Sequence, residues 1–136
     1  MNRILTYGTF DVFHYGHLKI LERARQMGDE LYVGVSTDLF NCQKGKRAFE
    51  AFPARRRKVF GTGLVSQVFS ENSMSQKRSD IARLNISIFV MGDDWKGEFD
   101  CLRDICEVRY LMRTPNISST MIRNSMQSSD VGQHSR

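Results

Sequence analysis

Cysteine is scarce in this chain, and long apolar runs are absent. The three cysteines, Cys42, Cys101 and Cys106, are odd in number and widely spaced, which argues against a disulfide framework and indicates free thiols in a reducing compartment. No apolar run approaches the roughly 18 residues that a membrane span needs. The single Arg before Ile4 and Leu5 is too short a start for a signal peptide. We therefore expect a cytoplasmic protein without membrane insertion.

Proline and glycine are also few, with two and ten residues among 136, which excludes a fibrous or low-complexity chain. A chain of this length is typical of one domain and buries roughly two thirds of its unfolded surface without a structural metal. Hydrophobic residues make up 40% and charged residues 26%. We expect one globular domain over residues 1–126 and a polar, flexible tail over residues 127–136.

Positive charge is present in excess but is confined to one segment. The chain has 20 Lys and Arg against 15 Asp and Glu, a net charge of +5. Residues 44–58 (KGKRAFEAFPARRRK) hold seven of those bases and one of those acids, which leaves 13 bases and 14 acids elsewhere. The excess of positive charge in residues 44–58 indicates that this segment binds an anion, either a nucleic acid or a smaller ligand.

Short apolar runs alternate with amphipathic segments along the chain. The pattern predicts strands over residues 3–7, 31–36, 65–69, 86–91 and 108–112. It predicts helices over residues 16–26, 53–60, 75–84, 98–104 and 118–124. We expect Gly28 to cap the first helix and segment 37–52 to be irregular. The alternation predicts an α/β fold, a Rossmann-like, doubly wound, mainly parallel five-stranded sheet with helices on both faces.

Ligands of such sheets bind beyond the carboxyl ends of the strands, and the segment GTFDVFHYGH over residues 8–17 lies there. His14 and His17 stand three residues apart at a predicted helix start, where free N–H groups and the helix dipole attract anions. Gly16 permits a close approach of the ligand. The segment therefore predicts a phosphate site with imidazole donors. Two ordinary histidines are the simpler alternative, but both lie at the ligand edge.

A zinc site is a weaker interpretation of the same histidines. It would join His14 and His17 to Cys101 and Cys106, but the pairs do not match the usual ligand spacing. We therefore expect no metal ligand among the protein side chains.

A second cluster, RTPNISST over residues 113–120, follows the last predicted strand. Arg113 can bind a phosphate through two hydrogen bonds, and Ser118, Ser119 and Thr120 place three hydroxyls at a helix start. Ser118 alone would suffice as an ordinary N-cap. Arginine together with three hydroxyls favours a phosphate site.

The basic segment divides into two parts. Lys44 and Lys46 follow the second predicted strand, and alternate residues of an extended loop point the same way, so both ammonium groups can reach one pocket. Arg55 to Lys58 are consecutive on a predicted helix and fan around it. We expect one or two of these four to serve the site, and Arg56, Arg57 and Lys58 to be solvated.

The segment MGDDWKG over residues 91–97 follows the most apolar strand. The carboxylates of Asp93 and Asp94 could hold a magnesium ion, a ribose hydroxyl or a base amine. A turn with local side-chain hydrogen bonds explains the segment equally well.

Over about residues 3–123 the sequence resembles the HxGH nucleotidyltransferase superfamily, and within it the glycerol-3-phosphate cytidylyltransferases. The carriers are TYGTFDVFHYGH, LERARQMGD, STDLFNCQKGKRAFE, IFVMGDDWKGEFD and RTPNISST. The histidine motif alone indicates only the superfamily. The RTPNISST form, together with MGDDW and the two-lysine loop, is much more specific to the cytidylyl branch.

The resemblance implies that CTP and sn-glycerol 3-phosphate react to CDP-glycerol and pyrophosphate, by direct attack of the acceptor phosphate on the α-phosphorus. It assigns a nucleotidyltransferase domain to residues 1–126, Mg²⁺ that travels with the nucleotide, a homodimer, and a product used for teichoic-acid or capsular polysaccharide synthesis. Catalytic roles are implied for His14, His17, Lys44 and Arg113. Nucleotide binding is implied for Thr9, Phe10, His14, Gly16, His17, Lys46, Asp94, Arg113, Thr114, Ile117, Ser118, Ser119 and Thr120. Acceptor binding is implied for Asp11, Lys44, Arg55 and Lys77.

The sequence departs from the family pattern between residues 61 and 74. The family has an Arg and an Asp flanking the third strand and then an aromatic residue, where this chain has Gly63, Ser66 and Met74. Two alternatives follow: another alcohol or polyol phosphate as acceptor, or a CTP-binding pseudoenzyme. A nucleic-acid-binding module is disfavoured, because it leaves the histidines and residues 113–120 unexplained and lacks interleaved aromatic residues.

Overall fold

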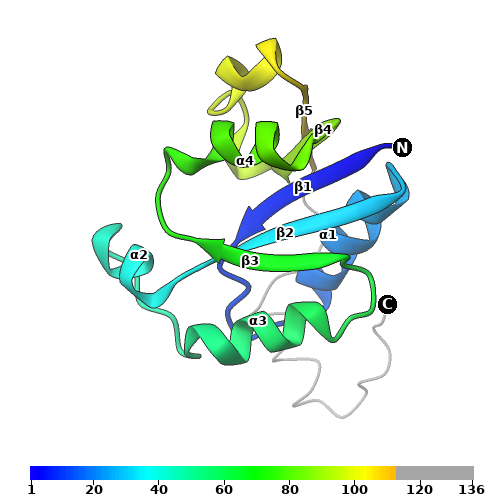
Figure 1. Cartoon of the computed structure of the whole chain (residues 1–136). Helices are drawn as coiled ribbons and strands as arrows, with labels where there is room; N and C mark the ends of the chain where they lie inside the picture. Colours follow the sequence, from blue (N-terminus) through cyan, green and yellow to red (C-terminus); the bar gives the residue numbers. More distant parts are fainter. Residues whose placement is uncertain (113–136) are drawn as a thin grey trace.

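The structure, a computed structural model, describes residues 1–112. Five strands form one sheet (Figure 1): β1 (Arg3–Gly8), β2 (Glu30–Ser36), β3 (Gln67–Glu71), β4 (Ile88–Gly92) and β5 (Glu107–Leu111). Four α-helices connect them: α1 (Tyr15–Gln26), α2 (Asp38–Gln43), α3 (Phe52–Phe60) and α4 (Gln76–Leu84). Two 3₁₀ helices, η1 (Asp93–Trp95) and η2 (Asp100–Asp104), lie between β4 and β5.

All described strand pairs are parallel, and the strand order is β3-β2-β1-β4-β5. The chain runs outward from β1 to β3 and then crosses to β4 on the other side of β1. The topological switch point therefore lies between β1 and β4, where open sheets of this kind place their ligand crevice.

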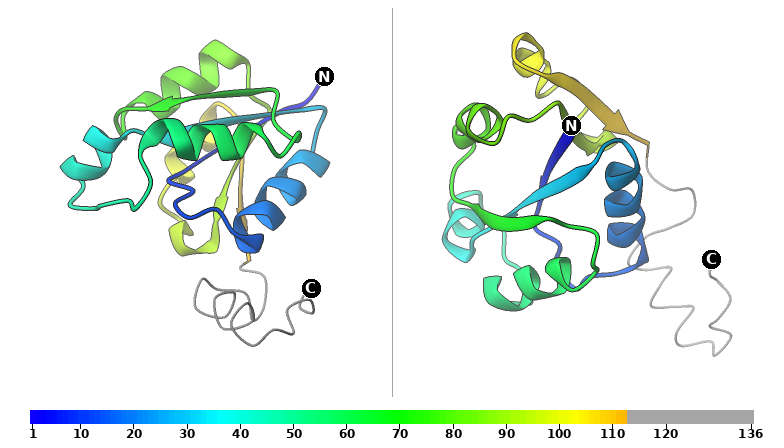
Figure 2. Two further views of the ribbon diagram at one scale, coloured as in Figure 1. Left: turned by 90° about the horizontal axis from the view of Figure 1, so that it is seen from below. Right: turned by 45° about the vertical axis from the view of Figure 1, so that its right-hand side comes forward.

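Helices cover both faces of the sheet, as the sequence predicts (Figures 1 and 2). On one face, Leu21 of α1 and Val59 of α3 belong to one cluster of buried apolar side chains. On the other face, Ile81 of α4 and Leu102 of η2 belong to a second cluster. Because both faces are covered, the central strands are largely apolar, which explains their nearly continuous hydrophobic sequence.

The structure departs from the predicted elements at several points. Strand β4 begins at residue 88, two residues after the predicted start. Segment 37–52 contains α2, which is capped by the Thr37 hydroxyl accepting from the Phe40 N–H at 3.1 Å. Residues 98–104 form only the 3₁₀ helix η2. Strand β3 begins at residue 67 and extends to residue 71, two residues beyond the predicted end. Local patterns missed α2 because it has only six residues.

Gly28 serves close packing instead of the predicted helix cap. The cap residue of α1 is Met27 in the right-handed helical region. A Cβ at position 28 would lie 2.7 Å from the Asn2 carbonyl oxygen and 2.8 Å from the Ile4 side chain. Glycine is therefore required where the chain passes β1 before entering β2.

No described helix is long and apolar enough to cross a membrane.

Candidate active site

The loop after β1 takes an uncommon backbone path into α1. Phe10 and Val12 have positive φ angles of 53° and 46°, a conformation that costs side-chain-bearing residues about 1–2 kcal/mol each. The Phe10 ring is buried against Phe13 and His17, and the Val12 N–H donates to the Glu50 carboxylate at 3.2 Å. These contacts hold a strained loop, which is typical of a functional site.

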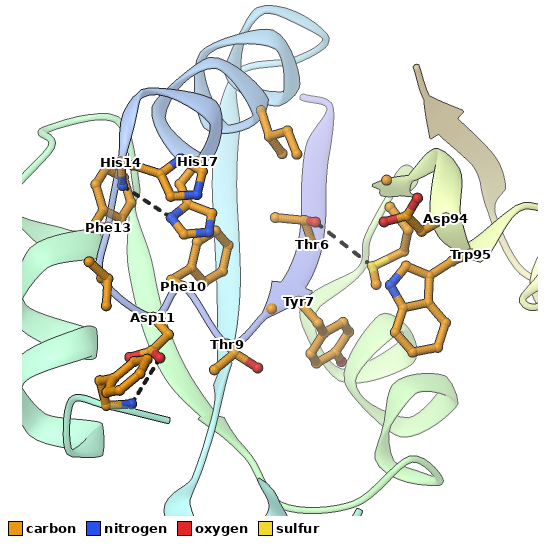
Figure 3. Close-up of a pocket in the computed structure, with 16 residues that line it drawn as sticks. Thr6, Tyr7, Thr9, Phe10, Asp11, Phe13, His14, His17, Asp94 and Trp95 are labelled. Atoms are coloured by element: carbon orange, nitrogen blue, oxygen red, sulfur yellow. Dashed lines mark hydrogen bonds between the residues drawn. The ribbon is translucent and has the colours of Figure 1, made fainter. Parts of the chain in front are cut away.

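His14 and His17 form the first turn of α1 and cap it with their own rings. The Gly16 N–H donates to His14 Nδ1 at 3.0 Å, and the His14 N–H donates to His17 Nδ1 at 3.2 Å. Since each Nδ1 accepts a hydrogen bond, the neutral rings carry their proton on Nε2. The rings are stacked with centroids 3.9 Å apart (Figure 3), so two N–H donors lie side by side.

Both imidazoles are held in the neutral form. Burial lowers the pKa of His14. The pKa of His17 is lowered to about 4, chiefly by burial and further by the neighbouring His14, although Asp11 opposes the shift. At neutral pH the pair therefore offers hydrogen-bond donors without carrying full positive charge.

The two histidines line a cavity of about 540 Å³ at the carboxyl ends of β1 and β4. This histidine cavity is bounded on one side by residues 8–14 and on the other by Met91, Gly92, Asp94 and Trp95. Figure 3 shows Asp94 and Trp95 across from the two histidines. The segments over residues 8–17 and 91–97, each of which follows a predicted strand, are thus brought together. Thr9, Phe10, Asp11 and Asp94 all line this cavity.

A second, smaller cavity of about 110 Å³ adjoins the first, and both are lined by Tyr7, Gly8, Thr9, Met91 and Trp95. Three lysines from two distant segments reach it: Lys44, Lys46 and Lys77. Glu71, Met74 and Phe99 complete its wall. In this lysine cavity, burial lowers the pKa of Lys44, whose ammonium lies 4.2 Å from the centroid of the Phe40 ring.

Arg55 lines neither cavity. Its side chain is fully buried and donates to the carbonyl oxygens of Thr9 at 3.0 Å, Ser36 at 2.7 Å and Glu50 at 2.9 Å, and to Asp38 at 2.7 Å. The guanidinium therefore joins the loops after β1 and β2. This geometry does not offer the acceptor contact that the resemblance implies for Arg55, because a helix turn aims the side chain inward.

Asp11 braces the same region from the other side. Its carboxylate accepts from the backbone N–H groups of Phe49 at 2.8 Å and Glu50 at 3.0 Å. The segment that carries Lys44 and Lys46 is thus tied to the segment that carries the histidines. Asp11 also lines the histidine cavity. It can therefore contact a ligand there while it holds the backbone of Phe49 and Glu50.

The three departures from the family pattern lie in different parts of the molecule. Gly63 and Ser66 precede β3, at the edge of the sheet opposite the cavities, where the Ser66 N–H donates to the Leu31 carbonyl at 2.8 Å. Met74 follows β3 and lines the lysine cavity. Of these three residues, Met74 is the one that lines a cavity formed by residues 1–112.

Sequence reasoning missed several residues of the cavity walls. Glu71, Tyr7 and Trp95 line them but were not singled out. Glu71 is the last residue of β3. Its place at the carboxyl end of a strand, where ligands bind in such sheets, was the signal that could have identified it. The predicted strand ended at residue 69 and obscured it.

Residues 113–136 lie outside the described part of the chain. The predictions for Arg113, Thr114, Ile117, Ser118, Ser119 and Thr120, for a helix over 118–124 and for the tail over 127–136 fall there. Among residues 1–112, no group of three or more His, Cys, Asp or Glu side chains is placed to hold a metal ion. The zinc ligand set of His14, His17, Cys101 and Cys106 is therefore not assembled.

Comparison with known proteins places the chain in a family. The model of a cytidylyltransferase-like family matches residues 5–125. The glycerol-3-phosphate cytidylyltransferase of Bacillus spizizenii is 51% identical over 94% of this chain and 99% of the relative, and that of Staphylococcus aureus is 45% identical over 96% and 99%. An ethanolamine-phosphate cytidylyltransferase of Arabidopsis thaliana is more distant, at 34% identity over 68% of this chain and 24% of the relative.

Solved structures share the fold. A lipopolysaccharide core biosynthesis protein from Thermoplasma volcanium superimposes with a TM-score of 0.71 at 23% identity, covering 84% of this chain and 97% of that one. A nicotinate-nucleotide adenylyltransferase homologue from Vibrio parahaemolyticus gives a TM-score of 0.58 at 14% identity, covering 97% and 85%. By the family model and the near full-length identity to its relatives, the chain belongs to the cytidylyltransferase-like family and, within it, to the glycerol-3-phosphate cytidylyltransferases.

Proposed function

We propose that this protein is a glycerol-3-phosphate cytidylyltransferase, which converts CTP and sn-glycerol 3-phosphate to CDP-glycerol and pyrophosphate. The observation that carries the proposal is the adjacency of the two cavities. One offers paired imidazole donors at a helix start, and the other offers three lysines. The relatives at 45–51% identity that carry this name support the same reaction.

The chemistry suits the residues present. A phosphate oxygen of the acceptor attacks the α-phosphorus in line, a P–O bond forms, and the bond to the β-phosphate breaks with its electron pair leaving on pyrophosphate. A phosphate monoester is already a nucleophile, so no enzyme nucleophile is needed. The protein brings two polyanions together and stabilises the charge that develops, which is positioning and electrostatics.

The histidine cavity is assigned to CTP. The Nε2–H groups of His14 and His17 donate to the triphosphate and to the leaving pyrophosphate. Thr9 and Phe10 approach the triphosphate from the loop after β1, and Gly16 approaches it from the first turn of α1. Asp94 orients the sugar or base from the opposite wall. Arg113, Thr114 and residues 117–120 are proposed to hold the β- and γ-phosphates. Lys46 contacts the nucleotide from the neighbouring wall.

The lysine cavity is assigned to the acceptor. Lys44 binds the phosphate of glycerol 3-phosphate and directs it toward the α-phosphorus, and Lys77 contacts the glycerol end. Asp11 and Arg55 hold the loops that carry these contacts.

Magnesium is proposed to enter with the nucleotide. Mg²⁺ takes oxygen ligands, usually one or two carboxylates together with phosphates and water, and Asp94 is a carboxylate of the histidine cavity. The residues present therefore fit a metal held mainly by the triphosphate. When bound, Mg²⁺ neutralises charge on the phosphates.

We further propose a cytoplasmic homodimer that takes no nucleic acid as partner and whose product serves teichoic-acid or capsular polysaccharide synthesis. The test is pyrophosphate release, measured with each of four nucleoside triphosphates against several alcohol phosphates. Turnover confined to CTP and glycerol 3-phosphate supports the proposal. Preference for another base or alcohol phosphate overturns the substrate assignment, and calorimetric CTP binding without turnover supports a pseudoenzyme.

A further inference from the structure

The lysine cavity contains a carboxylate where an anionic acceptor is expected to bind. Glu71 is 4% exposed and lines this cavity, but it does not line the histidine cavity. Among the described residues, it is the one acidic side chain in the wall of the lysine cavity. A carboxylate repels a phosphate, so its place beside three lysines calls for an explanation.

Pairing with Lys77 explains part of that position. The Glu71 Oε2 lies 2.6 Å from Lys77 Nζ, and the ammonium also lies 4.5 Å from the centroid of the Tyr7 ring and 5.4 Å from that of Phe99. Lys77 is 4% exposed, so its charge needs compensation. Buried ion pairs are often no more stabilising than apolar residues of the same volume, so stability alone does not account for the pair.

The geometry of the reaction orients the acceptor within the cavity. The acceptor phosphate must face the α-phosphorus, and hence the boundary with the histidine cavity formed by Gly8 and Thr9. Glu71 lines only the lysine cavity and its carboxylate repels a phosphate. Glu71 and its partner Lys77 are therefore expected to meet the end of the acceptor that is remote from the reacting phosphate. In glycerol 3-phosphate that end carries two hydroxyl groups.

A neighbouring acid is already engaged elsewhere. Asp80 accepts from the Tyr7 hydroxyl at 2.6 Å and from Gln76 at 2.8 Å, and it pairs with Arg83 at 3.1 Å. These bonds fix the Tyr7 ring against the Lys77 ammonium. Asp80 does not line the lysine cavity, so Glu71 is the carboxylate in its wall that can accept a hydrogen bond from the acceptor.

We propose that Glu71 is a specificity-determining residue that accepts hydrogen bonds from the hydroxyls of the acceptor, with Lys77 held beside it to donate to the hydroxyl oxygens. This inference rests on the proposed function of the same site. It predicts that the enzyme discriminates by hydroxyl groups as well as by the phosphate, because a buried carboxylate left without its hydroxyl partner is costly.

The experiment uses the full-length enzyme with CTP and compares two acceptors. One is glycerol 3-phosphate, and the other is n-propyl phosphate, which lacks both hydroxyls. The readout is the ratio of their kcat/KM values, from pyrophosphate release. We expect wild type to prefer glycerol 3-phosphate by about a hundredfold and Glu71→Gln to reduce that ratio about tenfold or more, with the KM for CTP unchanged. Glu107→Gln, at an exposed glutamate of β5 paired with Arg109, is the matched control and should keep the wild-type ratio.

A purely structural role for Glu71 gives a different result. If it only holds Lys77, Glu71→Gln lowers the rate with both acceptors equally and leaves the ratio as in wild type, which overturns the inference while the proposed function stands. If Glu71→Gln does not fold, as judged by thermal unfolding, Glu71→Asp keeps the charge and withdraws the carboxylate, and the same change of ratio is expected. A wild-type enzyme without turnover of glycerol 3-phosphate overturns the proposed function, and this inference with it.

Discussion

The histidine cavity and the lysine cavity adjoin each other but hold their polar groups by different physical means. The histidines are neutral, and their orientation comes from hydrogen bonds within the first turn of α1. Lys44 and Lys46 come from the segment that follows α2, Lys77 comes from α4, and the charge of Lys77 is balanced by Glu71. Neutral donors suit a ligand that must leave as pyrophosphate, whereas full charges suit the capture of an acceptor from solution.

The largest effect is expected from removing one imidazole donor while the helix cap is kept. In His14→Asn or His17→Asn the amide oxygen can replace Nδ1 as acceptor, but the Nε2–H donor is lost. We expect kcat to fall about 100- to 1000-fold, as for loss of one preorganised donor, with little change in melting temperature. Steady-state pyrophosphate release measures this, with His134→Asn as control. Near wild-type turnover in both variants would refute the mechanism.

Removing Arg55 is expected to loosen both cavities at once. Arg55→Met removes the guanidinium donor from the buried Ser36 carbonyl oxygen, from the part-buried carbonyl oxygens of Thr9 and Glu50, and from Asp38. We therefore expect a loss of about 3 kcal/mol in the free energy of unfolding. Urea denaturation measures it. Arg56→Met, at the exposed neighbouring position, should change stability by less than about 0.5 kcal/mol. Equal effects from the two substitutions would contradict the bracing role.

Acid is expected to lower the free energy of unfolding through a group of the histidine cavity, His17. The pKa of His17 is about 4 in the folded chain against an ordinary value of 6.5. The unfolded chain therefore binds more protons between these values, and stability falls as the pH drops through this window. From pH 7 to pH 5 this contributes a loss of about 2 kcal/mol.

The measurement is urea unfolding of wild type and His17→Asn at both pH values. Between pH 7 and pH 5 the free energy of unfolding should fall by about 2 kcal/mol less in His17→Asn than in wild type. The same slope in both proteins would show that His17 is not the group that titrates.

The smallest effect is expected at the lysine cavity. Lys44→Met keeps the apolar stem over Phe40 but removes one of three charges. We expect the KM for glycerol 3-phosphate to rise about tenfold, which corresponds to about 1.4 kcal/mol, while the KM for CTP stays within about twofold. Initial-rate kinetics with each substrate varied in turn measure both. A rise confined to CTP would reverse the assignment of the two cavities.

The sequence was informative where contacts are local. His14, Gly16 and His17 lie within one turn, so their common site follows from spacing alone, and the parallel sheet follows from the alternation of strands and helices. The inward course of Arg55 could not be predicted from its run of four bases, because burial depends on where α3 meets the loops after β1 and β2. Glu71 was missed for a similar reason: its meaning depends on Lys77 and on the aromatic rings around it.

The double use of the histidine rings has a consequence for amide hydrogen exchange. The N–H groups of His14 and Gly16 are bonded to the same imidazoles that are assigned to the triphosphate. Any event that turns or protonates a ring breaks one of these two hydrogen bonds and lets that amide exchange with solvent. A ligand that fixes the rings protects both amides from exchange. Two backbone positions thus report the occupancy of the histidine cavity without any label on the ligand.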